Sequence, residues 1–208
     1  MIVARLGGAF AKGDEDRGHH RTQCGHELPF DNGSQFVDNW HAAIHNDSRI
    51  EGSNLVQIAI EDPSQPDVLA LLLHGEEEAA RLYPPESNHH LPLDALREQN
   101  VFFHVARNAH GYAIGTGAVV LHGEWAEIKR VWVEPEARGQ GLSKAILHTL
   151  ELKSRQLGVR WLRLETGASS HTALTLYLST GYTVCLPFGD YSPDPLSVFM
   201  EKRLLPIT

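Results

Sequence analysis

The chain contains, at residues 130–157, the stretch RVWVEPEARGQGLSKAILHTLELKSRQL. Its β-branched and aromatic start, Val131-Trp132-Val133, favours a buried strand, and Pro135 ends that strand because proline lacks an amide donor. Gly139 and Gly141 permit a tight turn that brings bare amides close to a ligand. The amphipathic segment that follows directs the first amides of a helix toward the same point. We therefore predict strand, turn and helix in direct succession.

The predicted turn suits an anionic ligand. The helix dipole favours negative charge at the helix N-terminus, and the Arg138 guanidinium adds a forked donor for phosphate oxygens. Together these features predict a pyrophosphate site. The residues predicted to hold this pyrophosphate are Arg138, Gly139, Gln140, Gly141, Leu142 and Ser143.

The order Arg138-x-x-Gly141-x-Ser143, after a Val-x-Val strand that ends in proline, resembles the acetyl-coenzyme A signature of the GNAT acetyltransferase superfamily, in a small bacterial-type member. Ser143 stands where the family prefers glycine or alanine. The resemblance covers about residues 55–205 and implies acetyl-CoA as co-substrate. It also implies that Val131, Trp132 and Val133 contact the pantetheine arm. The alternative is an ordinary glycine-containing connection between a strand and a helix.

Composition narrows the classes of partner. The 208 residues are 42% hydrophobic and 21% charged, which is ordinary for a globular protein, and the net charge is −8. An acidic chain disfavours binding to nucleic acid or to an anionic membrane and mildly favours a cationic acceptor. No apolar run approaches the roughly 18 residues of a membrane span. With Cys24 and Cys185 far apart and no secretory signal at the start, we expect a cytoplasmic protein.

The first part of the chain differs from the rest. Residues 1–53 show little apolar periodicity, so we predict a loosely ordered N-terminal extension followed by an N-acetyltransferase domain at 54–208. Four metal-binding side chains cluster in this extension, but no paired CxxC or HExxH spacing accompanies them, and we expect no metal. These side chains are His19, His20, Cys24 and His26.

Periodicity and turn residues predict a mixed α+β fold. Strands are expected at 55–60, 101–106, 113–121, 126–133 and 159–165, with a C-terminal hairpin within 184–202. Helices are expected at 66–82, 92–99, 143–157 and 170–179. The result is a mostly antiparallel sheet of about six or seven strands with about four helices, in which the strand after the crossover helix runs parallel to the fourth. The GNAT resemblance implies that these two strands, the fourth and fifth, splay apart to form the cofactor cleft.

A second motif lies downstream. The pattern Ala173-x-x-Leu176-Tyr177-x-x-x-Gly181-Tyr182 resembles the second GNAT signature, in which the tyrosine lies near the thioester sulfur. Ser170 occupies a position where the family often has asparagine. The resemblance implies that Tyr177 supplies the proton for the departing thiolate. The alternative is an aromatic side chain packed in the core with its hydroxyl satisfied.

Acetyl transfer to an amine also requires a base. Glu127, in the strand that enters the cofactor turn, is the predicted base, since a carboxylate in a dry cleft has a raised pKa. Glu165 is the substitute, and an exposed Glu127 paired with Lys129 is the alternative interpretation. Segments that follow the first helix and precede the last strand are predicted to bind the acceptor. The candidate residues in these segments are Tyr83, Glu86, Asn88 and Tyr191, and Glu165 at the end of the fifth strand is a further candidate.

Neither cysteine lies in an activated constellation, so the sequence predicts direct attack by the amine in a ternary complex, without an acetylated enzyme. A non-catalytic acetyl-CoA sensor would use the same turn but would not need Glu127 or Tyr177. A nucleotide triphosphatase would need GxxxxGK[ST], and the local GQGLSK lacks that spacing. The identity of the acceptor and the formation of a homodimer stay open.

Overall fold

The computed structural model describes residues 55–87 and 89–205. The predicted extension at 1–53 and the predicted acceptor residue Asn88 lie outside the described residues. The proposed division of the chain at residue 54 therefore stays a prediction.

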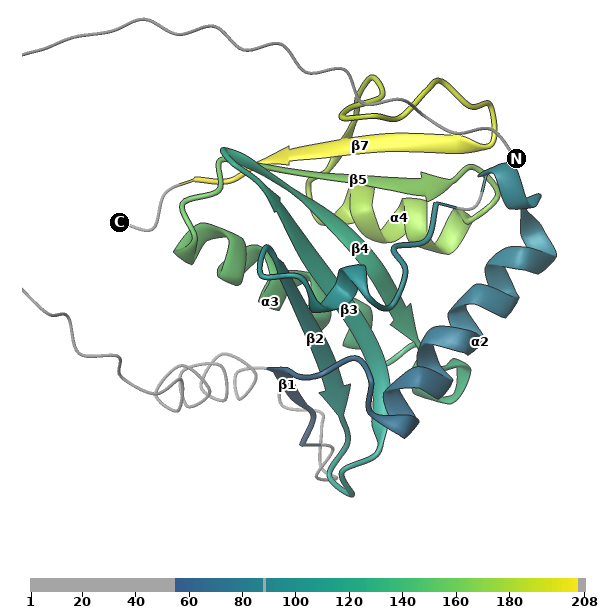
Figure 1. Ribbon diagram of the computed structural model, residues 1–208, viewed down its shortest axis with the longest axis vertical. Helices are drawn as coiled ribbons and strands as arrows, with labels where there is room; N and C mark the ends of the chain where they lie inside the picture. The colour runs from purple at the N-terminus through teal and green to yellow at the C-terminus, as the bar shows by residue number, and fades with distance from the viewer. Residues whose placement is uncertain (1–54, 88, 206–208) are drawn as a thin grey trace, which may run out of the picture. The chain divides into compact units, whose positions relative to one another are not determined.

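A seven-stranded mixed sheet forms the centre of the described part, in the order β1-β2-β3-β4-β5-β7-β6. Figure 1 labels β1 to β5 and β7. Neighbouring strands are antiparallel except for β4 and β5, which are parallel. The α+β prediction and the parallel pair are thus confirmed. The strands are β1 (Gln57–Ile60), β2 (Val101–Arg107), β3 (Ala113–His122), β4 (Trp125–Val133), β5 (Trp161–Gly167), β6 (Thr183–Val184) and β7 (Ser197–Arg203).

Three α-helices accompany the sheet in residues 55–87 and 89–205: α2 (Pro66–Leu82), α3 (Leu142–Gln156) and α4 (His171–Ser179). The prediction of a helix at 92–99 is wrong, because only a 3-10 turn, Ala95–Arg97, forms there. Eight residues are too few to offset helix nucleation without strong packing, and Leu96 alone is buried in that turn. Two more 3-10 turns cover Pro85–Ser87 and Pro135–Ala137. In this described part, no helix combines the length and apolarity needed to cross a membrane.

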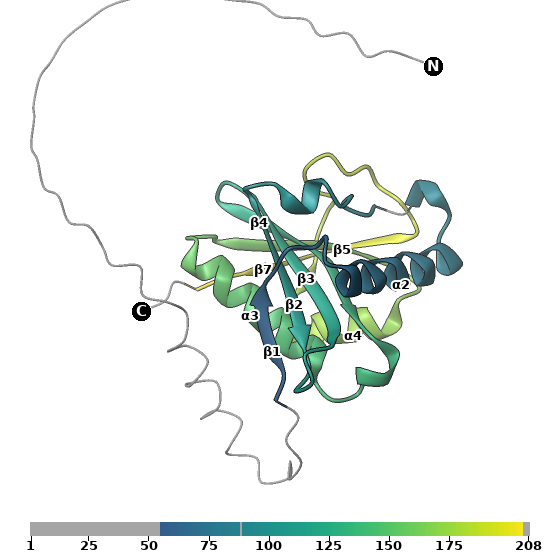
Figure 2. The ribbon, with the colours of Figure 1, turned by 60° about the horizontal axis from the view of Figure 1, so that its bottom comes forward.

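The helices α2 and α3 cover opposite faces of the sheet (Figure 2). On one face, Val68 and Leu72 of α2 pack with Phe103 and Val105 of β2. On the other face, α3 lies so close to β3 that a Cβ on Gly117 would be 2.8 Å from Ile146 Cγ2. Glycine in β3 therefore sets how closely the central helix approaches the sheet.

The parallel pair β4–β5 separates partway along its length. Pairing runs from Trp125↔Trp161 to Ile128↔Leu164 and then stops, although β4 continues to Val133. The last residues of β5 pair only with β7 among the described strands. The predicted splaying of the fourth and fifth strands is confirmed, and it leaves one edge of β4 without a strand partner beyond Ile128.

Candidate active site

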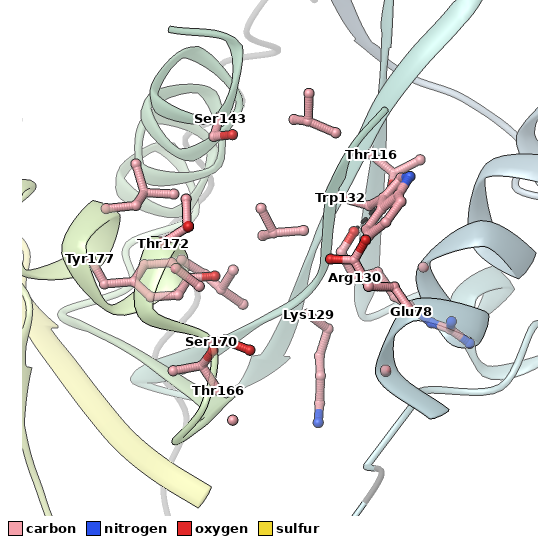
Figure 3. A pocket seen from close by; sticks show the side chains of 18 of the residues that line it. Glu78, Thr116, Lys129, Arg130, Trp132, Ser143, Thr166, Ser170, Thr172 and Tyr177 are labelled. Atoms are coloured by element: carbon pink, nitrogen blue, oxygen red, sulfur yellow. Dashed lines mark hydrogen bonds between the residues drawn. The ribbon is translucent and has the colours of Figure 1, made fainter. Parts of the chain in front are cut away.

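A cavity of about 1110 Å³ occupies the place where β4 and β5 separate. Its walls come from the end of β4 and α2 on one side and from α3, α4 and the end of β5 on the other. Figure 3 shows these walls facing each other, with Lys129, Arg130 and Trp132 opposite Ser143, Ser170 and Tyr177. The splayed strands thus hold a site large enough for an extended ligand.

The glycine turn forms one end of this cavity. Gly139 and Gly141 adopt φ of +77° and +80°, a region that favours glycine. Gly141 is the N-cap of α3, and no side chain caps this helix, so its first amides are available to an anion. A Cβ on Gly141 would meet nothing within 4 Å. Four of the five residues predicted for this turn line the cavity, Gly139, Gly141, Leu142 and Ser143, whereas Gln140 is not among the lining residues.

Arg138 also lines the cavity and is held against the end of β4. Its Nε donates to the Val133 carbonyl at 2.9 Å, and its guanidinium lies 4.7 Å from the centre of the Trp132 ring. Its Nη2 lies 3.3 Å from a carboxylate oxygen of Glu78 on α2. The guanidinium therefore joins the turn to both β4 and α2, beside the helix N-terminus.

The cavity-lining part of β4 contains a β-bulge. The register shifts between Thr116 and Ala118 of β3, so that two residues of β4, Arg130 and Val131, stand opposite Gly117. Arg130 has φ of 55°, and no other non-glycine residue described has a positive φ. The Thr116 hydroxyl donates to the Arg130 carbonyl at 2.8 Å. The predicted pantetheine residues Val131, Trp132 and Val133 follow directly and all line the cavity.

Tyr177 reaches the cavity from α4, and its side chain extends toward the gap in Figure 3. It is 6% exposed. Burial, with a smaller contribution from the nearby Glu165 carboxylate, raises the pKa of the phenol well above its ordinary value. The hydroxyl therefore keeps its proton at neutral pH, as a proton donor must.

The two carboxylates considered as bases lie in different surroundings. Glu127 is 7% exposed and is not among the residues that line the cavity. Its Oε1 accepts a hydrogen bond of 2.7 Å from the Tyr191 hydroxyl and lies 3.1 Å from Lys129 Nζ. Glu127 is thus paired with Lys129, as the alternative interpretation expected, but buried rather than exposed. Glu165 lines the cavity, and its Oε1 accepts a hydrogen bond of 2.6 Å from the Ser197 hydroxyl.

Of the predicted acceptor residues, some line the cavity and others do not. Tyr83 lines the cavity, and its hydroxyl lies 2.9 Å from the Ser170 hydroxyl, which joins the end of α2 to the start of α4. Its ring covers Gly167, where a Cβ would be 2.0 Å from the phenol. Glu86 is exposed and is not among the lining residues. Tyr191 is not among the lining residues either, and its hydroxyl accepts a hydrogen bond from Lys129 Nζ.

Sequence reasoning missed Lys129 and Arg130 as residues of the site, since Lys129 was considered only as a partner of Glu127. Both line the cavity. The available signal was two consecutive cations, between Ile128 and Val131, in a strand otherwise expected to be buried. Among the described residues, no group of three His, Cys, Asp or Glu side chains could hold a metal ion.

A splayed parallel strand pair, an uncapped helix N-terminus and a buried tyrosine thus lie around one cavity, an arrangement that suits an acyltransferase with a phosphate-containing co-substrate. The acetyltransferase (GNAT) family model matches residues 69–182, more than half of the chain, and the protein belongs to this family. It is an acetyl-CoA-dependent N-acetyltransferase.

Relatives agree with this assignment. An IAA acetyltransferase of Azospirillum brasilense is 41% identical over 72% of this chain and 98% of its own length. The uncharacterized N-acetyltransferase YsnE of Bacillus subtilis is 35% identical over 72% of this chain and 100% of its own. A Klebsiella pneumoniae structure named as an acyl-CoA N-acyltransferase has a TM-score of 0.60 and 38% identity, over 73% of this chain and 99% of its own.

A more distant structure shares the fold alone. It is a GNAT acetyltransferase from Elizabethkingia anophelis with acetyl-CoA bound, with a TM-score of 0.53 and 21% identity over 72% of this chain and 98% of its own.

Proposed function

We propose that the protein transfers the acetyl group of acetyl-CoA to an amine of a small molecule or peptide, by direct attack within a ternary complex. The observation that carries this proposal is the shared cavity: the α3 N-terminus, the unpaired edge of β4, Tyr177 and Glu165 all line it. A donor thioester and an acceptor amine can therefore meet in one cavity.

The residues present fit the co-substrate. The uncapped α3 amides and Arg138 suit the pyrophosphate, and the open space at Gly141 accommodates a close approach. The β4 edge from Val131 to Val133 offers backbone groups to the pantetheine arm. Acetyl-CoA supplies a thioester carbonyl that an amine can attack.

The proton path uses two side chains of the cavity. The neutral amine nitrogen attacks the thioester carbon, the C–S bond breaks, and the sulfur takes the Tyr177 proton. Before the attack, a carboxylate accepts one proton from the ammonium form of the acceptor. After the attack, the nitrogen loses a second proton, which returns through solvent to Tyr177. We favour Glu165 as that carboxylate because it lines the cavity, while the original prediction of Glu127 stays untested.

Direct transfer is supported by the cysteine in the described part of the chain. Cys185 is not among the residues that line the cavity, and burial raises the pKa of its thiol. A thiol that keeps its proton is a poor nucleophile. An acetyl-cysteine intermediate at this position is therefore disfavoured.

The acceptor end favours a positively charged amine in its resting form. Glu165 provides a carboxylate, and Tyr83 and His89 provide aromatic surface in the same cavity. The net charge of −8 supports attraction of a cationic acceptor and argues against nucleic acid as a partner. We also propose a cytoplasmic location, in keeping with the sequence.

An amine panel tests the proposal. Alkylamines, aralkylamines, polyamines, amino acids and peptide N-termini are each incubated with the purified protein and acetyl-CoA, while free thiol is measured and products are weighed by mass spectrometry. We expect acceptor-dependent thiol release and a product heavier by one acetyl group. Acetyl-CoA binding by calorimetry, without an acetylated product from any class, would favour the sensor alternative.

The base is assigned with the best acceptor from the panel. Glu165→Gln should lower kcat most at low pH, where the acceptor remains an ammonium ion, and higher pH should partly restore it. Glu127→Gln is the comparison variant for the original prediction. The reverse pattern would return the role of base to Glu127.

A further inference from the structure

Lys129 and Arg130 are consecutive in β4, yet both side chains reach the same loop, residues 89–91. In a regular strand, consecutive side chains point to opposite faces of the sheet. The bulge at Arg130, with its φ of 55°, removes this alternation. A backbone distortion in the donor site thus turns a second cation toward the acceptor side.

Arg130 binds the loop through Nε and Nη2 of its guanidinium group. Its Nε donates to the Leu91 carbonyl at 2.9 Å, and Nη2 donates to the same oxygen. Its Nη1 lies 2.6 Å from Oε1 of Glu76 on α2, and the side chain is only 9% exposed. A buried fork of this kind fixes both partners more tightly than a single neutral hydrogen bond would.

Lys129 holds the other end of the same loop. Its Nζ donates to the His89 carbonyl at 3.0 Å and to the Tyr191 hydroxyl, and it lies 3.1 Å from Glu127 Oε1. The side chain is 13% exposed. Each cation therefore has a carboxylate partner, Glu127 for Lys129 and Glu76 for Arg130, so the pair adds little net positive charge to repel an ammonium acceptor.

The held loop is part of the cavity. His89, His90 and Leu91 all line it, and they belong to no helix or strand that could fix their position. Side-chain donors from β4 supply that support instead. The shape of the acceptor wall consequently depends on two residues of the strand that carries the predicted pantetheine contacts.

We propose that Lys129 and Arg130 form a clamp that positions loop 89–91 as the acceptor wall, and that the β4 bulge is what allows both side chains to reach this loop. The proposal rests on the proposed function for the identity of the acceptor. Both are positioning residues, acting through the loop. Loss of the clamp should weaken acceptor binding and leave acetyl-CoA binding intact.

The first test measures the loop itself. Arg130→Gly keeps a residue that tolerates positive φ and removes the guanidinium. Arg107→Gln is the control, since Arg107 also bonds two carboxylates and a carbonyl, Glu61, Asp67 and Gly111, but does not line the cavity. Hydrogen exchange by mass spectrometry should show faster exchange in peptides spanning 83–98 for Arg130→Gly alone. Exchange equal to wild type there would overturn the clamp, and this test needs no acceptor.

The second test separates acceptor recognition from stability. With the best acceptor of the amine panel, Arg130→Gly should raise the acceptor KM about tenfold or more, while the acetyl-CoA Kd stays within about threefold. Arg130→Lys, which retains the charge but not the fork, should restore part of the KM. Arg107→Gln should change neither constant. An acceptor KM unchanged in Arg130→Gly, despite faster loop exchange, would overturn the role in acceptor recognition.

Discussion

Tyr177 and Tyr182 are both buried phenols, and their rings meet edge to face at 5.7 Å. Only Tyr177 lines the cavity. Tyr182 is therefore a buried neighbour without access to the ligand, which makes it a control for the role of Tyr177.

Tyr177→Phe should lower kcat by about 10²-fold with little change in acetyl-CoA affinity, because it removes the proton for the leaving thiolate. Tyr182→Phe should keep wild-type kcat. Steady-state rates with the best acceptor, together with calorimetric acetyl-CoA titrations, check both. Equal losses in the two variants would indicate that Tyr177 acts through packing alone.

Because of His104, we expect the stability of the fold to decrease at acidic pH. It is buried in β2, and burial, with a smaller contribution from Lys153, lowers its pKa to about 4. Because the unfolded chain binds this proton below about pH 6.5 and the folded chain does not, stability should fall as pH drops from 6.5 to 4, by up to about 3 kcal/mol.

The variant His104→Asn places an amide nitrogen near the position of Nδ1, which lies 3.0 Å from the Phe102 carbonyl. It should be less stable at pH 7 but lose less stability between pH 6.5 and 4 than wild type. Urea unfolding across that pH range measures the difference. Parallel curves for the two proteins would show that other groups cause the acid sensitivity.

At the scale of elements, two similar glycines at the ends of α3 allow an effect on acetyl-CoA binding to be distinguished from an effect on stability. Gly141 is the N-cap of α3 and Gly158 follows the end of this helix, with φ of 80° and 75°. A Cβ on either glycine would meet nothing within 4 Å. Alanine at either position should therefore cost a similar strain, about 1–2 kcal/mol. Only Gly141 lines the cavity.

Gly141→Ala should weaken acetyl-CoA binding at least about tenfold, because the added methyl group occupies space that the pyrophosphate needs. Gly158→Ala should lower Tm by about as much as Gly141→Ala does, but its affinity for acetyl-CoA should equal that of the wild type. Calorimetry and thermal unfolding of both variants test the assignment. Unchanged affinity in a folded Gly141→Ala protein would place the pyrophosphate elsewhere.

Elements that depend on local pattern were predictable. The stretch 130–157 forms the end of a strand, a turn and α3, with α3 at Leu142–Gln156 against a prediction of 143–157. The structure of segment 92–99 was not predictable, because the apolar residues of so short an element are compatible with a turn as well as with a helix. Local propensity therefore predicted the glycine turn before α3 and wrongly predicted a helix at 92–99.

Contacts between residues far apart in the sequence could not be predicted from the sequence. The Tyr83–Ser170 contact joins residues 87 apart, and the Tyr191–Glu127 bond joins residues 64 apart. Periodicity assigns residues to faces but does not say which carboxylate a distant loop will cover. That is why Glu127 was predicted in the cleft, while the structure buries it against Lys129 and Tyr191.

At the scale of the whole molecule, the family match begins at residue 69, and the Azospirillum relative is matched over 98% of its length by 72% of this chain. The described fold begins with β1 at Gln57. We therefore predict that deletion of residues 1–53 leaves acetyl-CoA Kd within about threefold and Tm within about 3 °C of the full chain.

A second deletion, of residues 1–61, supplies the control because it also removes β1 and Glu61. It breaks the register from Gln57↔Arg107 to Ile60↔His104 and the ion pair of 2.7 Å between Glu61 and Arg107. Arg107, with 19% of its side chain exposed, would lose a principal carboxylate partner, and Tm should fall by more than about 5 °C. Thermal unfolding and acetyl-CoA titration of both proteins are the measurements. If the 1–53 deletion were as unstable as the 1–61 deletion, or failed to bind acetyl-CoA, the extension would belong to the catalytic domain.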